Sequence, residues 1–408
     1  MGYELDEAGV KRLEEYFENR IGQHLRDCRK RESFAMYAFG ILGEGERKSA
    51  EPIAARACAD PRRARAVHEK LLHFVGRSHW SDQAVRREAA LYAAEALGAR
   101  EPLTTWIVDD TGFLKQGTHS VGVQRQYTGS AGKIANCQLG VSLVLATPTE
   151  HLPIDFELYL PKTWTEDLAR RDEAKIPAGV VFKSKVELAI DMMRRARKNG
   201  IPGEIAMADS FYGRSSTFRS AARELGLDYA VAVDSDTRVW TLDSLERRRD
   251  GPMLVRDVAN PKSRRRFRRY SWREGTKATL TSRFCFVRVL PAADDGVEPE
   301  QRERVWLVIE WEDGQAKPTT FILTTLPRRL SKKQIVRLLK ERWRTERAYE
   351  DLKGELGLDH FEGRSYPGWH HHVSVVICCY AFIVAERARH FPPSRRRPSR
   401  TDAHHFAA

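Results

Sequence analysis

The sequence predicts an α/β protein in which a mixed β-sheet follows a helical domain and is interrupted by a β-rich insertion. Three observations support this fold class. Residues 1–100 have helical periodicity, residues 101–235 alternate strand-like and helical segments, and residues 236–325 return to strand-like runs before helices resume at 326–391. With 408 residues, the chain is long enough to form more than one structural unit.

The N-terminal domain is predicted from helical segments at 6–20, 31–42, 50–58, 61–74 and 81–97. Basic clusters at 26–31 and 62–65 suit contacts with phosphate groups. For either cluster taken alone, an ordinary solvated helix face is the alternative interpretation.

The next unit, residues 101–235, contains strand-like segments at 104–108, 120–127, 136–146 and 154–160. A helix then begins at a capping box formed by Ser184 and Glu187 and ends at Asn199 and Gly200. A strand at 204–208, a helix at 215–225 and a strand at 229–233 follow. Strands that can form an antiparallel meander, followed by alternating helix and strand, imply a mixed sheet with helices packed on it. This order is that of a ribonuclease H-like domain.

The β-rich insertion is predicted from strand-like runs at 284–290, 304–311 and 319–325, the last two joined across the Asp313-Gly314 turn. A basic run with an aromatic residue inside it precedes them, made of Arg264, Arg265, Arg266, Phe267, Arg268 and Arg269. We expect these arginines to contact phosphate groups, with a flexible solvated run as the alternative. The tail at 392–408 is rich in arginine, serine and proline, so we expect it to be disordered.

The C-terminal helices are predicted to include a long helix that begins at a second capping box, formed by Ser331 and Gln334. Its apolar face carries charge further along, through Arg342, Glu346 and Lys353. An acid that faces a core costs several kcal/mol unless it is paired or binds a metal, so Glu346 needs a partner. Arg342, Lys353 or a metal cation would serve. A surface helix with i,i+4 ion pairs is the alternative.

The composition narrows the class of function. A net charge of +13 and a pI near 9.5 favour a polyanionic partner, of which nucleic acid is the commonest, although a merely basic soluble enzyme is the alternative. The six cysteines form no C-x-x-C pair, which argues against a zinc ribbon or a redox dithiol. There is no N-terminal apolar signal, and the longest apolar run, 373–385, is short for a bilayer. We therefore expect a cytoplasmic protein without a membrane segment.

Three acidic positions carry the predicted chemistry. Asp109 and Asp110 follow the strand at 104–108, and Asp209 follows the strand at 204–208. In a ribonuclease H-like sheet these two strands are neighbours, and a helix packed on the sheet can bring Glu346 to the same point. Three carboxylates favour Mg²⁺ or Mn²⁺ over zinc, and two such ions support in-line displacement at phosphorus. For Asp209 alone, a turn or helix cap is the alternative.

Several motifs resemble those of the DDE transposases of bacterial insertion sequences, in the branch known as insertion sequence family 701. These motifs are DDTGF (109–113) with Lys115 and Gly117, SVGVQRQY (120–127), NCQ (136–138), LYLP (158–161), ADSFYG (208–213) and GELGLDHFEG (354–363). The wider group also has a helix motif of Tyr, Arg, Glu and Lys, which this sequence matches at Arg342, Glu346 and Lys353. At the Tyr position it has Leu339 instead.

The resemblance implies an enzyme that cuts DNA at the ends of its own element and joins the 3′-hydroxyls to target DNA. Asp109, Asp209 and Glu346 would be the catalytic residues and hold two Mg²⁺ ions, or Mn²⁺. Arg342 and Lys353 would contact DNA beside Glu346. The resemblance also implies a homodimer in the synaptic complex, in the bacterial cytoplasm at the nucleoid. A catalytically inactive, domesticated DNA-binding protein is one alternative. A glycosidase with paired acids is another, but it gives no reason for the positive charge.

Two choices stay open at the level of sequence. Relatives often place the metal-binding acid two residues before Thr or Ser, which favours Asp109 over Asp110, with Thr111 behind it. In the insertion, Trp306 or Trp311 could hold an unpaired base as in hairpin-forming relatives, but packing beneath the insertion is the stronger interpretation. The two tryptophans are five positions apart, so on one strand they face opposite sides and at most one belongs to the core.

Overall fold

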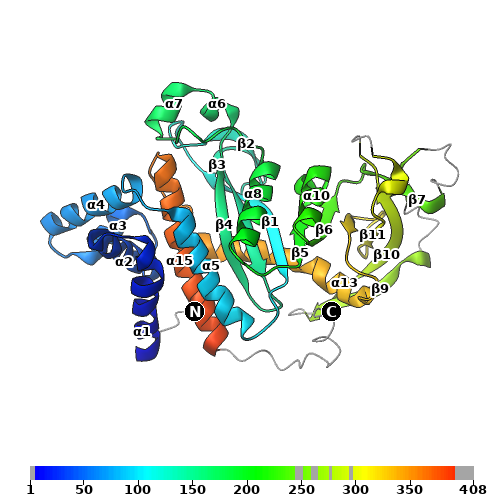
Figure 1. Ribbon diagram of the computed structural model, residues 1–408, viewed down its shortest axis with the longest axis horizontal. Helices are drawn as coiled ribbons and strands as arrows, with labels where there is room; N and C mark the ends of the chain where they lie inside the picture. The colour runs from blue at the N-terminus through cyan, green and yellow to red at the C-terminus, as the bar shows by residue number, and fades with distance from the viewer. Residues whose placement is uncertain (1–4, 244–250, 259–264, 275–277, 294–296, 391–408) are drawn as a thin grey trace.

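The computed structural model describes residues 5–243, 251–258, 265–274, 278–293 and 297–390 (Figure 1). The predicted tail at 392–408 and Arg264 therefore lie outside the described residues. Five N-terminal helices occur where the periodicity predicted them, as α1 (Glu7–Glu15), α2 (Cys28–Leu42), α3 (Ala50–Ala57), α4 (Pro61–Gly76) and α5 (Asp82–Gly98). A π-helical turn, Tyr16–Ile21, extends α1.

Twelve described strands form one continuous sheet. The first six are β1 (Thr105–Leu114), β2 (Gln124–Thr128), β3 (Lys133–Ala146), β4 (His151–Tyr159), β5 (Ile205–Ala208) and β6 (Asp228–Val233). The other six are β7 (Arg238–Thr241), β8 (Met253–Leu254), β9 (Arg268–Glu274), β10 (Thr279–Pro291), β11 (Val305–Trp311) and β12 (Thr320–Thr324). Their order is β2-β3-β1-β5-β6-β12-β11-β10-β7-β8, with β4 paired to β3 and β9 paired to β10.

The part of the sheet from β4 to β6 confirms the predicted ribonuclease H-like class. β1 is antiparallel to β3 and parallel to β5, and β5 is parallel to β6. The capped helix α8 (Lys185–Lys198) and α10 (Ser216–Glu224) connect these strands, and the Ser184 capping box is present as predicted. Shorter helices are α6 (Lys162–Thr165), α7 (Leu168–Glu173), α9 (Ser210–Gly213) and α12 (Val255–Val258).

The predicted β-rich insertion is continuous with the main sheet, because β12 pairs with β6 and continues through β11 to β10. The hairpin across Asp313 and Gly314 is present as predicted. The basic run differs from the flexible alternative: part of it is strand β9, and the Phe267 ring is buried against Trp311 in an edge contact at 5.4 Å. Strand β1 is also longer than predicted, since it continues through both aspartates to Leu114.

The predicted long C-terminal helix is divided in two. Its start is confirmed, with α13 (Lys332–Leu339) capped by Ser331 and Gln334. A 3₁₀ turn, Lys340–Arg342, then separates it from α14 (Trp343–Gly354). This turn rotates the second half relative to the first, so the face that carries Ile335 does not continue through Glu346. Tyr349 is buried, whereas the Glu346 side chain is 64% exposed.

The last helix, α15 (Tyr366–His390), crosses the protein between the N-terminal helices and the sheet (Figure 1). It packs against α5, α4, α2 and β4. The helix is longer than the apolar run noted in the sequence, and by length and hydropathy it could cross a membrane. However, 94% of its most apolar window is buried inside the protein, which is how the core helix of a globular protein behaves. The domain boundaries stay predictions.

Candidate active site

Two parallel strands bring Asp109 and Asp209 together. The register pairs Val108 of β1 with Ala208 of β5, and each aspartate is the next residue along its strand. Asp209 lies just beyond β5 and caps α9, accepting hydrogen bonds from the backbone amides of Phe211 at 3.0 Å and Tyr212 at 3.3 Å. Asp209 therefore does act as a helix cap, which was the alternative interpretation of this residue. The cap uses only one carboxylate oxygen, Oδ1, and leaves Oδ2 without a bond to either amide.

The two carboxyl groups are difficult to ionise together. Burial raises the pKa of Asp109 to about 7, and the neighbouring charge of Asp209 adds to this rise while Arg342 opposes it. Burial also raises the pKa of Asp209, and the charge of Asp110 contributes. A pair of half-buried acids that repel each other is a site where a divalent cation would offset the repulsion.

Asp109 and Asp110 have different partners, as expected for neighbours on a strand. Asp110 forms an ion pair with Lys185, Nζ to Oδ2, at 2.7 Å, and accepts a hydrogen bond from the Tyr212 hydroxyl at 3.3 Å. Asp109 has a looser contact with Arg342, at 3.5 Å. Asp110 is thus already neutralised within the protein, whereas Asp109 has the weaker counter-charge.

Lys185 was not singled out from the sequence. It is the first residue of α8, its ammonium lies 3.9 Å from the centroid of the Phe211 ring, and its charge lowers the pKa of Asp209. A cation at the positive end of a helix is unfavourable unless an acid lies nearby. That position, directly after the N-cap residue Ser184, was the only signal of this contact in the sequence.

Glu346 is linked to Asp109 through Arg342. The Arg342 guanidinium lies 3.7 Å from Glu346 Oε1 and 3.5 Å from Asp109 Oδ2. Arg342 and Glu346 also line a cavity of about 380 Å³, together with Trp272, Arg273 and Trp343. The expectation that Glu346 faces the core is wrong, because the 3₁₀ turn before α14 leaves its side chain exposed.

Lys353 lies apart from Glu346 and ties α14 to β1. Its ammonium donates hydrogen bonds to Thr111 Oγ1 and the Gly112 carbonyl, both at 2.8 Å, and to Ser130 Oγ at 3.2 Å. An ammonium group has three hydrogens, so each has an acceptor within the protein. A second contact connects α14 to the sheet, because the hydroxyl groups of Tyr349 and Ser142 are hydrogen-bonded at 2.7 Å. Ser142 lies on β3, where it pairs with Asp109 of β1.

The donor set fits a magnesium or manganese ion in part. Asp109 and Asp209 offer carboxylates at the ends of neighbouring strands, and the charge of Asp209 contributes to the raised pKa of Asp109, which suits a hard divalent cation. Glu346 is linked to Asp109 only through Arg342. Among the residues that the structure describes, no three His, Cys, Asp or Glu side chains gather closely enough to form a metal site.

Comparison with known proteins agrees with this arrangement. The DDE superfamily endonuclease family matches residues 20–279, which include Asp109 and Asp209. The transposase DDE domain family matches residues 181–382, which include Asp209 and Glu346. The chain is 28% identical over 217 residues to a Microchaete diplosiphon protein named "Probable transposase for insertion sequence element IS701". That match covers 53% of this chain and 52% of the relative, so the chain spans about half the length of the curated relative it matches. The chain belongs to the DDE superfamily endonucleases, and the resemblance to insertion-sequence transposases is confirmed.

Proposed function

We propose that the protein is a DNA transposase that cleaves at the ends of an insertion sequence and joins the 3′-hydroxyl ends to target DNA. The observation that carries the proposal is the pair of half-buried aspartates, Asp109 and Asp209, on neighbouring strands, with Asp109 linked by Arg342 to Glu346. The family match and the similarity to a transposase support it. The partner would be DNA, held by a homodimer when two ends are brought together.

Asp109, Asp209 and Glu346 would hold two Mg²⁺ ions, with Mn²⁺ as a substitute. Such ions supply an activated water or 3′-hydroxyl and stabilise the leaving oxygen. Asp109 would be the ligand from β1, since Asp110 is committed to Lys185 and Tyr212. Asp110 is the alternate ligand.

The other residues position this set. Arg342 offsets the charge of Asp109 and Glu346 and can turn toward a phosphate at the scissile end, because its guanidinium contacts are loose ion pairs. Lys353 holds α14 against β1, and DNA contact by its ammonium would require it to exchange one of its three protein acceptors. Lys185 holds the Asp110 carboxylate in an ion pair at 2.7 Å.

The arginines of the insertion would bind the DNA backbone. Arg265, Arg266, Arg268 and Arg269 are exposed in the structure, and Arg264 lies outside the described residues. Arg269 forms an ion pair with Asp313 at 2.8 Å, so its charge is already offset. We therefore expect the other arginines to contribute more to DNA binding.

A metal titration of cleavage tests the proposal. We expect Asp109→Asn and Glu346→Gln to abolish cleavage of a duplex that carries the element end, at any Mg²⁺ or Mn²⁺ concentration. Asp110→Asn should lower the rate by about 10- to 100-fold and recover with added metal, because it orients rather than binds the ion. All three variants should still bind the duplex in EDTA.

Two outcomes would contradict this assignment. Equal cleavage by Glu346→Gln and the parent protein would remove Glu346 from the site. Rescue of Asp109→Asn by metal without rescue of Asp110→Asn would exchange the roles of the two aspartates. If the parent protein binds DNA but cleaves nothing with either metal, the inactive DNA-binding alternative replaces the transposase.

A further inference from the structure

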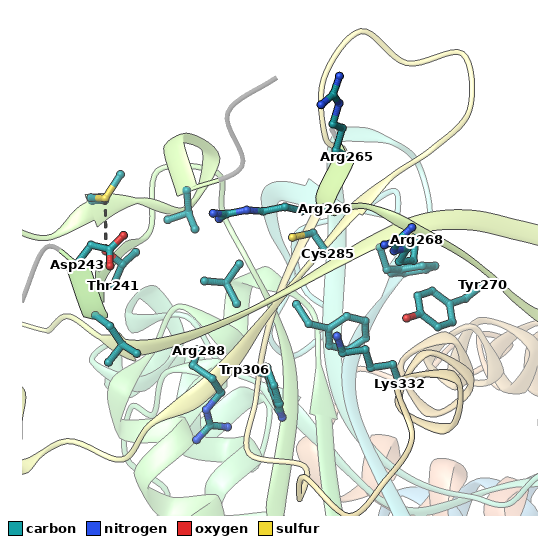
Figure 2. Close-up of a pocket in the computed structure, with 16 residues that line it drawn as sticks. Thr241, Asp243, Arg265, Arg266, Arg268, Tyr270, Cys285, Arg288, Trp306 and Lys332 are labelled. Carbon is teal, nitrogen blue, oxygen red and sulfur yellow. Dashed lines mark hydrogen bonds between the residues drawn. The ribbon is translucent and has the colours of Figure 1, made fainter. Parts of the chain in front are cut away.

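An open cavity of about 920 Å³ lies in the insertion, and Asp109, Asp209 and Glu346 are not among the residues that line it (Figure 2). Strands β9, β10 and β11 line it together with Lys332, the first residue of α13. The cavity beside Glu346 lies at the opposite end of α13, where Leu339 lines its wall. The two cavities therefore lie toward the two ends of one helix, and Phe284 of β10 lines both of them.

The charge of this cavity is strongly positive. Five cationic side chains line it against one acid, Asp243, and they are Arg265, Arg266, Arg268, Arg288 and Lys332. Within the part of the chain that the structure describes, none of these five forms an ion pair with an acidic residue. The arginines nearby behave differently, since Arg269 and Arg283 both pair with Asp313. Unpaired cations concentrated in one cavity favour an anionic ligand.

Arg288 is the most constrained of the five. Burial lowers its pKa, and the charge of Arg328 lowers it further. One guanidinium nitrogen donates to the Arg304 carbonyl, while Nε is buried without a hydrogen-bond partner. A half-buried guanidinium among other cations costs free energy in the absence of a ligand, and an anion in the cavity would recover that cost.

Two aromatic side chains of the cavity, Trp306 and Phe286, each lie against one of its cations. Arg288 lies 4.9 Å from the centroid of the Trp306 ring, directly across the ladder between β10 and β11. Lys332 lies 5.3 Å from the centroid of the Phe286 ring. Figure 2 shows Arg288 and Trp306 side by side. A base that stacked on Trp306 would have to displace Arg288, so the arrangement favours phosphate groups over bases.

We propose that this cavity binds phosphate groups of the DNA backbone at a distance from the scissile phosphate. Arg288 and Lys332 make the contacts, with Arg266 and Arg268 at the rim, and Trp306 positions Arg288. This inference rests on the proposed function for the choice of DNA as the ligand. It assigns Trp306 a positioning role that differs from holding an unpaired base.

The test measures binding of a fluorescein-labelled duplex of arbitrary sequence by anisotropy, in EDTA and over a range of salt concentrations. Backbone contacts release counterions, so Arg288→Ala and Lys332→Ala should each reduce the salt slope of the binding constant by about 0.9. The double variant should lose about twice as much, and Arg288→Lys should retain the parent slope. Arg283→Ala is the matched control, because Arg283 lies on the same strand but pairs with Asp313, and its slope should not change.

A second readout separates backbone contact from base stacking. Trp306→Leu should weaken duplex binding several-fold, and Trp306→Phe should restore it, since the ring orients Arg288. Duplexes with 2-aminopurine at each position in turn should show the same fluorescence with parent and Trp306→Leu proteins. A fluorescence change that is lost only in Trp306→Leu would replace the backbone assignment with base stacking.

The outcomes also separate this inference from the proposed function. If the parent protein cleaves the element end and the Arg288→Ala, Lys332→Ala double variant keeps the parent salt slope, the cavity assignment is wrong and the transposase stands. If the slopes fall as expected but the parent cleaves nothing, the cavity assignment stands and the transposase fails. Thermal unfolding midpoints close to that of the parent show that each variant is folded.

Discussion

Two buried or half-buried arginines, Arg86 and Arg288, have opposite surroundings. Arg86 on α5 is 1% exposed and contacts Asp82 at 2.8 Å, Asp155 at 3.1 Å and Glu157 at 3.7 Å. Burial alone would lower the pKa of Arg86, but these carboxylates raise it above its ordinary value. Arg288 in the insertion has cationic neighbours, and its pKa is lowered.

The comparison distinguishes a charged cluster that stabilises the fold from a charged cluster that is available to bind a ligand. The Arg86 cluster links α5 to β4, and Arg195 of α8 joins it through Asp155 and Glu157, both at 2.7 Å. Its cost of burial is offset within the protein. No acidic residue among the described residues forms an ion pair with Arg288. The charge of Glu303 opposes the lowering of the Arg288 pKa only in part, because Glu303 is itself paired with Arg223 at 3.0 Å, and an external anion would supply the remaining offset. Three predictions test this contrast.

The largest effect is expected at Arg86. Replacing it by methionine leaves Asp155 and Glu157 buried with one cation fewer, so the free energy of unfolding should fall by about 3–5 kcal/mol. Chemical denaturation followed by tryptophan fluorescence measures this change. A loss below about 1 kcal/mol would show that Arg195 and His370 suffice for the two acids.

The second-largest effect on stability is expected at His372, a neutral polar side chain. His372 of α15 is buried, contacts the Tyr37 hydroxyl at 2.9 Å and the Gly357 carbonyl at 3.0 Å, and burial lowers its pKa to about 4. Because the unfolded state takes up a proton near pH 6.5 and the folded state only near pH 4, stability is lost as the pH falls between these values. The loss should reach about 3 kcal/mol.

The variant His372→Gln removes this titration and keeps a neutral polar side chain. The difference in unfolding free energy between parent and variant should therefore change with pH across that window and stay constant above it. Parallel curves for the two proteins from pH 4 to 7 would show that His372 does not titrate with folding.

The smallest effect on stability is expected at Arg288. Replacing it by methionine removes a cation that other cations repel, and the methionine can still cover Trp306. The free energy of unfolding should therefore change by less than about 0.5 kcal/mol, in contrast to Arg86. A large loss in this variant would mean that Arg288 stabilises the fold, and the contrast between the two regions would no longer hold.

Much of the fold could be predicted because its signals are local. Capping boxes at Ser184 and Ser331 define the starts of α8 and α13, and short continuous apolar runs define β5 and β6. Strand β9 was missed because arginines obscure its alternation, although Tyr270 and Trp272 are two residues apart and both pack on Phe284. The extension of β1 was missed because its ladder partner, β3, determines where it ends.

The candidate site was predictable in its residue types but not in its geometry. The acids on β1 and β5 follow from strand order, which the sequence could suggest. The ion pair of Asp110 with Lys185 joins residues 75 positions apart, and the exposure of Glu346 depends on a three-residue 3₁₀ turn. The position of Lys185 at the start of α8 indicates only that an acid lies nearby and does not identify Asp110, because both features arise from how α8 and α14 dock on the sheet.

The helix α13 sets the distance between the two cavities. Its eight residues extend for roughly 12 Å, at about 1.5 Å per residue, between the cationic cavity and the cavity beside Glu346. Phe284 of β10 lines both cavities, so the same strand joins them beside α13. At about 3.4 Å of axial rise per base pair, that spacing corresponds to roughly three to four base pairs of duplex. A DNA strand bound in the cationic cavity at one end of α13 would therefore place a phosphate, a fixed number of nucleotides away, in the cavity beside Glu346 at the other end.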